Sequence, residues 1–139
     1  MKYFDIRELV DQQVYNIHGQ RAFRFFDPNL LYALDTIRGI LGKKITVNDW
    51  MWFGKFSQRG LRHNQSPLVR KKVAPYLSAH CLGRAVDFDV QGMTAEEVRT
   101  WLVRKDLFNF KIRLEAGVNW VHLDTIEEEK NPKVYLFHP

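Results

Sequence analysis

The sequence predicts an α+β fold, a small antiparallel sheet with helices packed on it. Three observations lead to this prediction: apolar residues recur at helical spacing in two segments, apolar and polar residues alternate in several short segments, and the helical segments are grouped around the short ones. With 45% hydrophobic residues, a chain of 139 residues can bury a core without cross-links. Its length has room for one domain, which we expect to span residues 1–139.

The first predicted helix covers residues 28–41. Asp27 occupies the N-cap position, Pro28 follows at the first helical position, and Gly42 ends the segment. Its apolar stripe consists of Leu30, Leu31, Leu34, Ile37, Ile40 and Leu41. A half-buried strand is expected next, at 44–49, where apolar and polar residues alternate.

An aromatic stretch and a long loop follow this strand. We assign Trp50, Trp52 and Phe53 mainly to the core, with a place along a cleft as the alternative. Residues 54–79 are expected to be irregular, because prolines limit regular structure there. A long loop inside a compact domain is usually functional.

A strand and a second helix come after the loop. Residues 83–90 alternate so that one face of the strand is apolar and the other carries two carboxylates, Asp87 and Asp89. Residues 94–97 have the spacing of a capping box, which predicts the start of a helix. The buried stripe of that helix consists of Val98, Trp101 and Leu102.

The C-terminal part of the chain predicts further strands. Strands are expected at 110–115 and 118–124, joined as a hairpin at Ala116-Gly117. An edge strand at 133–137 completes the predicted sheet.

Composition limits the compartment and the partners. A formal net charge of +5 favours an anionic partner, but the basic residues are scattered and no nucleic-acid recognition motif is present, so we expect no nucleic acid partner. The single Cys81 excludes an intramolecular disulfide. No stretch approaches the roughly 18 apolar residues of a membrane span. We therefore expect synthesis in the cytoplasm without a signal peptide, and no membrane partner.

Three residues are candidates for a catalytic metal site. Such a site needs three histidine or carboxylate ligands and an open fourth position, where a water molecule is acidified. His80 precedes a predicted strand, Asp87 lies on it, and His122 lies on a different strand, so two distant segments must converge. Spacing alone does not separate a metal site from structural histidines here.

Two motifs add a resemblance to a known family. The string from Ser78 to Asp87, Ser-Ala-His-Cys-Leu-Gly-Arg-Ala-Val-Asp, and the later Trp-Val-His-Leu-Asp at 120–124 resemble the zinc D-Ala-D-Ala carboxypeptidase and L-Ala-D-Glu endopeptidase family. Its signature is Ser-x-His-x-x-Gly-x-Ala-x-Asp with a downstream ligand histidine, and all five fixed positions match. The resemblance covers residues from about 25 to 124. It implies a hedgehog-like or DD-peptidase-like fold, and Zn²⁺ held by His80, Asp87 and His122.

The resemblance also implies how the substrate is held. Family enzymes bind a peptide carboxylate through an arginine of the loop before the signature, a task suited to a planar guanidinium. Arg62 occupies the matching place, with Arg59 as the alternative. Ser78 is a second candidate for substrate binding, although it could equally cap a turn.

The chain departs from the family pattern at the catalytic base. Many relatives carry an acid three residues before the final ligand, and this chain has Asn119, whose amide cannot accept the proton. If the hairpin loop has an even number of residues, Glu115 falls on the same face as Arg113, Trp120 and His122, and we favour Glu115 as the base. Asp124 shares that face as a second catalytic candidate or as a residue that orients a ligand. Asp89 is open to the same two interpretations.

The resemblance implies a function. We expect a zinc metallopeptidase that hydrolyses an amide bond in peptidoglycan stem peptides, as a D-Ala-D-Ala carboxypeptidase or an endolysin-like endopeptidase. A small chain for which we expect no signal peptide fits a phage or prophage protein that acts on the cell wall. The alternative is a catalytically weakened zinc module that serves binding or structure, as the hedgehog domain shows the fold can do. Asn119 supports that alternative.

Overall fold

The computed structural model describes all 139 residues. Its α-helices are α1 (Gln12–His18), α2 (Pro28–Leu41) and α3 (Ala95–Lys105), and its 3-10 helices are η1 (Ile6–Glu8), η2 (Gly19–Phe25) and η3 (Trp50–Trp52). Its strands are β1 (Ile45–Thr46), β2 (Ala85–Val90), β3 (Ile112–Glu115), β4 (Val121–Asp124) and β5 (Val134–Phe137), and they form one sheet. The predicted α+β class is confirmed.

The sheet is mixed, and the prediction of a purely antiparallel sheet was wrong. The strand order is β1-β2-β4-β3-β5, and the first three pairings are antiparallel. β5 lies at the edge, as expected for 133–137, but runs parallel to β3. The chain leaves β4 beside the start of β3, where Asp124 pairs with Arg113, and enters β5 at the same end, where Val134 pairs with Ile112.

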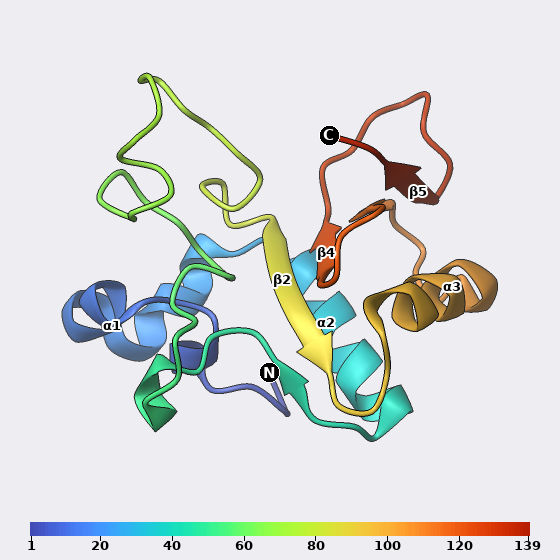
Figure 1. Cartoon of the computed structure of the whole chain (residues 1–139), viewed down its shortest axis with the longest axis horizontal. Coiled ribbons are helices and arrows are strands. Elements are labelled where there is room, and N and C mark those ends of the chain that lie inside the picture. The colour runs from blue at the N-terminus through green and yellow to red at the C-terminus, as the bar shows by residue number, and fades with distance from the viewer.

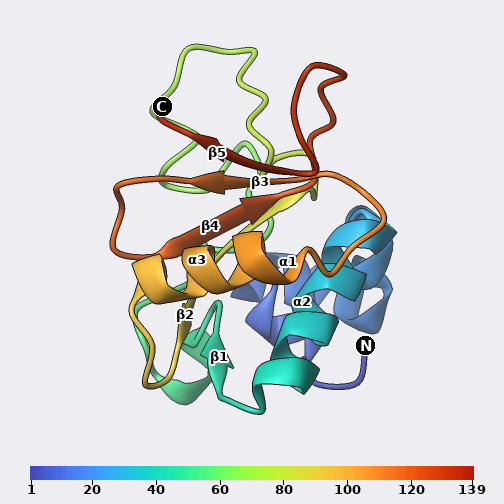
Figure 2. The same cartoon turned by 90° about the vertical axis from the view of Figure 1, so that its right-hand side faces the viewer.

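The pleat separates a face covered by helices from a face that carries polar groups. α2 and α3 lie on one side of the strands (Figure 2). On that side β2 and β4 present the apolar pairs Val86 with Leu123 and Phe88 with Val121, all of them buried. Successive side chains of a strand point to opposite faces, so the residues between these pairs point away from the helices.

The helix ends follow local capping signals. Asp27 caps α2, Pro28 begins it, and Gly42 ends it in the left-handed conformation, as predicted. At α3, the Thr94 hydroxyl accepts the Glu97 N–H and the Glu97 carboxylate accepts the Thr94 N–H, each at 3.1 Å, which confirms the capping box. None of the helices combines the length and the apolar character that a membrane-crossing segment requires.

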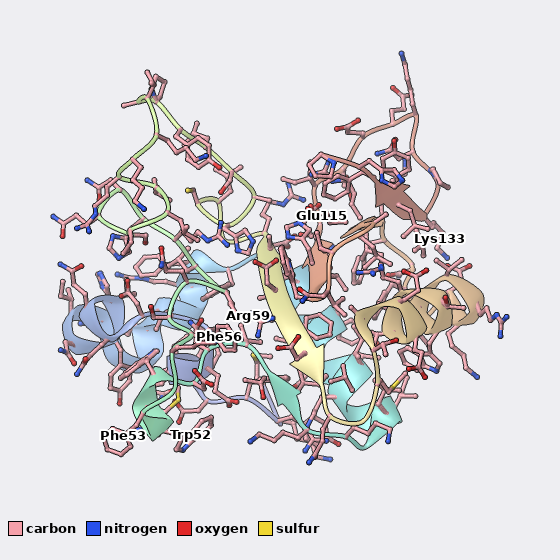
Figure 3. The ribbon with its side chains drawn as sticks, viewed as in Figure 1. Trp52, Phe53, Phe56, Arg59, Glu115 and Lys133 are labelled. Atoms are coloured by element: carbon pink, nitrogen blue, oxygen red, sulfur yellow. The ribbon has the colours of Figure 1, made fainter.

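The segment after α2 differs from the prediction. The strand expected at 44–49 is reduced to the two residues of β1. Trp52 is 58% exposed and Phe53 is fully exposed, so neither belongs to the core. The reason is a tight turn: the Asp49 carboxylate accepts the Phe56 N–H at 2.8 Å, which holds the intervening residues outside the core. Figure 3 shows Trp52 and Phe53 together at the lower left, far from Glu115.

The N-terminal segment, for which the sequence predicts no element, packs beneath the irregular loop. Leu9 is fully buried, and its carbonyl oxygen accepts the Leu61 N–H at 2.9 Å. The Asn48 N–H donates to the Glu8 carbonyl at the same distance. These bonds tie the start of the chain to the segment that leads into the predicted signature.

Two irregular segments flank the ends of β2 and β4. Residues 54–79 contain no helix or strand, as predicted, and rise at the upper left of Figure 1. Residues 125–133, between β4 and β5, rise at the upper right. The polar ends of the central strands therefore lie between two loops.

Gly83 fixes the turn before β2 against the N-terminal segment. Its φ of +68° is in the left-handed region, and a Cβ there would lie 1.9 Å from the Phe25 carbonyl oxygen. Its carbonyl oxygen accepts the Asp27 N–H at 2.9 Å. Glycine at position 83 is therefore required for both conformation and close packing.

We expect Gly83→Ala to lower the free energy of unfolding by about 3–5 kcal/mol, because left-handed strain and a steric clash add. Gly117→Ala is the matched control, since Gly117 has a φ of +79° but no atom within 4 Å of the added Cβ. That control should cost only the strain, about 1–2 kcal/mol. Urea denaturation of both variants measures the difference, and equal losses would contradict the packing role.

Candidate metal centre

The polar face of the sheet brings His80, Asp87 and His122 together. Asp87 on β2 pairs directly with His122 on β4, and His80 lies in the turn before β2. One donor atom from each residue lies within 4.8 Å of the others, and all three residues are buried. The two distant segments that a metal site requires to converge lie side by side.

Gly60 orients the His80 ring. The Nδ1–H of His80 donates to the Gly60 carbonyl oxygen at 2.8 Å, and Nε2 lies 3.3 Å from Oδ2 of Asp87. A side chain at Gly60 is excluded, because its Cβ would lie 2.0 Å from the Leu9 carbonyl oxygen. The loop backbone thus determines which nitrogen of His80 faces the cluster.

His122 is held between two carboxylates. Its Nδ1 lies 2.8 Å from Oδ1 of Asp87, and its Nε2 lies 2.9 Å from Oδ2 of Asp124. Asp124 is completely buried, and it also accepts two parallel hydrogen bonds from Arg113, at 2.8 and 3.0 Å. Such a carboxylate fixes the ring orientation of a ligand histidine. These contacts favour the orienting role for Asp124 over that of a proton acceptor.

The positive charge of His122 and the negative charges of Asp87 and Asp124 stabilise one another. Burial alone would lower the pKa of His122, but its hydrogen bonds with Asp124 and Asp87 outweigh burial and raise the pKa to about 9. Burial opposes ionisation of Asp87, yet the hydrogen bond from His122 and the neighbouring His80 ring hold its pKa well below the usual range. The same balance, with His122 and Arg113 as partners, lowers the pKa of Asp124. In the metal-free protein near neutral pH, His122 is therefore protonated and donates to both carboxylates.

The donor set fits a small divalent ion. Tetrahedral coordination by nitrogen and oxygen at about 2.0–2.2 Å separates donor atoms by roughly 3.4 Å. Asp87 meets the two rings through different oxygens, Oδ1 at 2.8 Å from His122 and Oδ2 at 3.3 Å from His80, and one donor atom from each residue lies within 4.8 Å of the others. The nitrogen that would remain free of the ion is already hydrogen-bonded in each ring. In His122 it is Nε2, bonded to Asp124, and in His80 it is Nδ1, bonded to Gly60. The three residues could therefore hold a metal ion.

Of the two candidate arginines, Arg62 contacts the cluster. Its Nη2 donates to Oδ2 of Asp87 at 3.1 Å, and its side chain lines the cleft over the cluster. Arg59 instead forms an ion pair with Asp89 at 2.8 Å. The Arg59 guanidinium also lies 4.2 Å from the centre of the Phe56 ring, and Figure 3 labels both residues. Arg62 is thus the arginine within reach of a bound ligand, and Asp89 is neutralised by its partner.

Ser78 closes the turn that carries His80. Its hydroxyl oxygen accepts the Cys81 N–H at 3.4 Å, and the hydroxyl lies 3.5 Å from the Cys81 sulfur. Ser78 also lines the cleft, so the turn contact does not remove it from the surface that a substrate would meet.

A cleft of about 590 Å³ opens over His80, Asp87 and His122. Residues of the loop before β2, among them Tyr76 and Leu77, form one wall. Ile126, Glu128 and Phe137 form the other wall, from the C-terminal segment. The two flanking loops of Figure 1 thus contribute opposite sides of one cavity.

Glu115 reaches this cleft from β3. Leu114 pairs with Leu123, which leaves an even number of residues between them and brings Glu115 opposite His122 on the same face. The condition under which Glu115 was predicted to face the cluster is fulfilled. On its other side Glu115 pairs with Phe137 of β5.

Four carboxylates line the cleft, and Glu115 differs from the other three. Asp87 and Asp124 are hydrogen-bonded within the cluster, and Glu128 lies 3.5 Å from Arg113. Glu115 has no hydrogen-bond or ion-pair partner in the protein. It is therefore the carboxylate of the cleft that is available to a ligand or a water molecule.

Three contributors to the site were not assigned a role from the sequence. Gly60 acts through its carbonyl, which no side-chain motif reports. Arg113 was placed on the correct face by alternation, but its pairing with Asp124 depends on strand register. Phe137 packs edge-on to His122, with ring centres 5.7 Å apart, and under Arg113 at 4.8 Å. Its position requires the parallel pairing of β5, for which the sequence gives no signal.

Comparisons with protein-family models, with curated proteins and with solved structures found no match.

Metal binding should release about one proton per ion near pH 7.5, because the ion displaces the proton on Nδ1 of His122. With a His122 pKa of about 9, apparent affinity should rise with pH up to that value, by about tenfold per unit, and level off above it. Calorimetric titration of Zn²⁺ or Co²⁺ in buffers of different ionisation enthalpy measures the release. A buffer-independent heat would contradict the charge state assigned to His122.

Asp124→Asn should weaken metal binding by about 10–100-fold, because an amide cannot accept from both Arg113 and His122 through two oxygens. Asp89→Asn is the control, since Asp89 is on the same face of the sheet but pairs with Arg59. Competition with a chromophoric chelator measures both affinities. Equal losses would indicate a general effect of removing negative charge.

Proposed function

We propose that the chain is a zinc-dependent peptidase that hydrolyses an amide bond in peptidoglycan stem peptides. The observation that carries the proposal is the buried group of His80, Asp87 and His122 at the floor of a cleft, with the unpaired carboxylate of Glu115 beside it. Two imidazoles and one carboxylate form a known ligand set of catalytic zinc, which keeps a further position open. When bound, zinc supplies Lewis acidity to the scissile carbonyl and lowers the pKa of the attacking water.

Glu115 acts as the general base in this proposal. Its carboxylate has no protein partner to hold it away from the cleft, and it shares a row of the sheet with Asp87 and His122. A proton acceptor must come within hydrogen-bond distance of the water from which it takes the proton. Asp124 is unsuited to that task because its hydrogen bonds to Arg113 and His122 already occupy both oxygens.

Arg62 binds a carboxylate of the substrate. Its guanidinium donates one hydrogen bond to Asp87 and one to the Gln58 carbonyl, at 3.1 and 2.7 Å, so it is positioned before substrate arrives. A planar fork held in this way loses little conformational entropy on binding a carboxylate. Ser78, from the same loop, also lines the cleft and adds a hydroxyl.

The assignment to peptidoglycan rests on the signature. The five fixed positions include Gly83, for which the fold gives a packing reason, and His80 and Asp87, which lie in the cluster. A motif whose residues meet around one site is more informative than the same letters scattered over the surface. Stem peptides also supply the free carboxylate that Arg62 requires.

The alternative function is a zinc module without hydrolytic activity. Asn119 favours it, because this exposed residue stands where many related enzymes carry the acid. Asn119 lines a neighbouring groove with Arg59 and Asp89, and it does not line the cleft that contains Glu115. The two proposals therefore differ in whether Glu115 replaces the missing acid.

Incubation of the purified protein with peptidoglycan, with and without a chelator, tests the activity. We expect new amino termini that disappear with the chelator and return when Zn²⁺ is added. A protein that binds one zinc ion per chain but releases no amino termini would be a binding module, and the peptidase proposal would fail.

Glu115→Gln should lower the hydrolysis rate by about 10²–10⁴-fold while zinc content and thermal stability stay unchanged. Glu128→Gln is the matched control, because Glu128 lines the same cleft but is engaged with Arg113. A loss confined to the control would transfer the role to Glu128. Asn119→Asp is a further test. If wild type is inactive and this variant hydrolyses peptidoglycan, the natural protein is the zinc module without hydrolytic activity.

A further inference from the structure

A second cavity of about 900 Å³ lies beside the proposed active-site cleft. α1 forms one side of it and the loop before β2 forms the other. Its base is apolar and includes the buried side chains of Val14, Leu61 and Val69. Its rim exposes Ile17 and Leu77, which are 64% and 72% accessible. An apolar concavity with a few polar groups is the usual form of a ligand site.

The polar groups of this cavity are basic or neutral. Arg62, Arg70 and Lys72 line it, together with two histidines, and no carboxylate does. Neither Arg70 nor Lys72 forms an ion pair within the protein. Asp11, on the neighbouring turn, is engaged by His63 at 2.7 Å. The cavity therefore presents uncompensated positive charge next to apolar surface, which complements a group that is both anionic and partly aliphatic.

The cavity adjoins the cleft over His80, Asp87 and His122. Both are lined by Arg62, Tyr76, Leu77 and Leu82. Arg62 stands at the boundary, because it also contacts Asp87 of the cluster. A peptide whose scissile bond lies over the cluster and whose chain passes Arg62 would enter the second cavity.

We propose that this cavity is a substrate subsite that selects stem peptides with a free acidic side group near the scissile bond, through Arg70 and Lys72. The identity of the peptide rests on the proposed function, whereas the binding of an acidic group in this cavity does not. The carboxylate lies between the two cations, and the aliphatic part of the same segment covers Leu61 and Val69. A stem peptide whose glutamate carboxylate is amidated loses this interaction.

Peptide binding to the metal-depleted protein tests the subsite without hydrolysis. The probes are two fluorescent synthetic stem peptides that are identical except that the glutamate α-carboxylate is free in one and amidated in the other. Fluorescence anisotropy should show about three- to tenfold tighter binding of the free acid, as expected for two partly exposed ion pairs. Raising the salt concentration should reduce the preference.

Two variants assign the preference to its residues. The double variant Arg70→Gln/Lys72→Gln should bind both peptides equally. Lys71→Gln is the matched control, because Lys71 lies between them in sequence but does not line the cavity, and it should keep the preference. Equal binding of the two peptides by wild type, a preference that survives the double change, or equal loss in the control would each overturn the inference.

The same peptides, with zinc restored, separate this inference from the proposed function. If neither peptide is cleaved but the free acid still binds more tightly through Arg70 and Lys72, the peptidase proposal fails and the subsite stands. If both are cleaved and bound equally, the peptidase proposal stands and the subsite falls.

Discussion

The His122 ring, hydrogen-bonded on both sides to carboxylates, is the interaction on which the rest of the site depends. It joins β2 to β4 across the sheet, through Asp87, and joins β4 to Arg113 of β3, through Asp124. The strand register that makes this possible is also the register that buries Val86 and Phe88 beneath the helices. A slip of one residue would expose the apolar side chains and disperse the polar ones, so core packing and site geometry are selected together.

The carboxylates of the site divide into two kinds, and the division has a physical cause. Asp87 and Asp124 are buried and surrounded by hydrogen-bond donors, so they remain ionised and fixed. Glu115 reaches the cleft without a partner. Carboxylates of the same chemical type are thus held differently by their surroundings, two of them fixed by donors and one left free to meet a ligand.

Local signals in the sequence predicted most of what is local in the fold. The ends of α2 follow from Asp27, Pro28 and Gly42, and the start of α3 follows from a capping box, because each depends on neighbours within one helical turn. The parallel pairing of β5 and the packing of the first residues under the loop were missed, because both depend on contacts between distant segments.

The candidate site shows the same limit. His80, Asp87 and His122 could be grouped through the signature, and alternation along β3 and β4 gave the shared face of Arg113 and Asp124. Sequence spacing left the role of Asp124 open, since the choice depends on which group occupies its oxygens. The Gly60 carbonyl carried no signal, because a backbone acceptor looks the same in any residue.

The close contact of Gly60 with Leu9 has a consequence for the dynamics of the chain. Leu9 accepts a backbone hydrogen bond from Leu61, and the neighbouring Gly60 accepts one from the His80 ring. Two hydrogen bonds therefore connect the N-terminal segment to His80. Local opening of residues 8–10 would release the ring from its fixed orientation. Any ion that requires that orientation would then protect the amide hydrogens of the first residues from exchange with solvent, although it touches none of them.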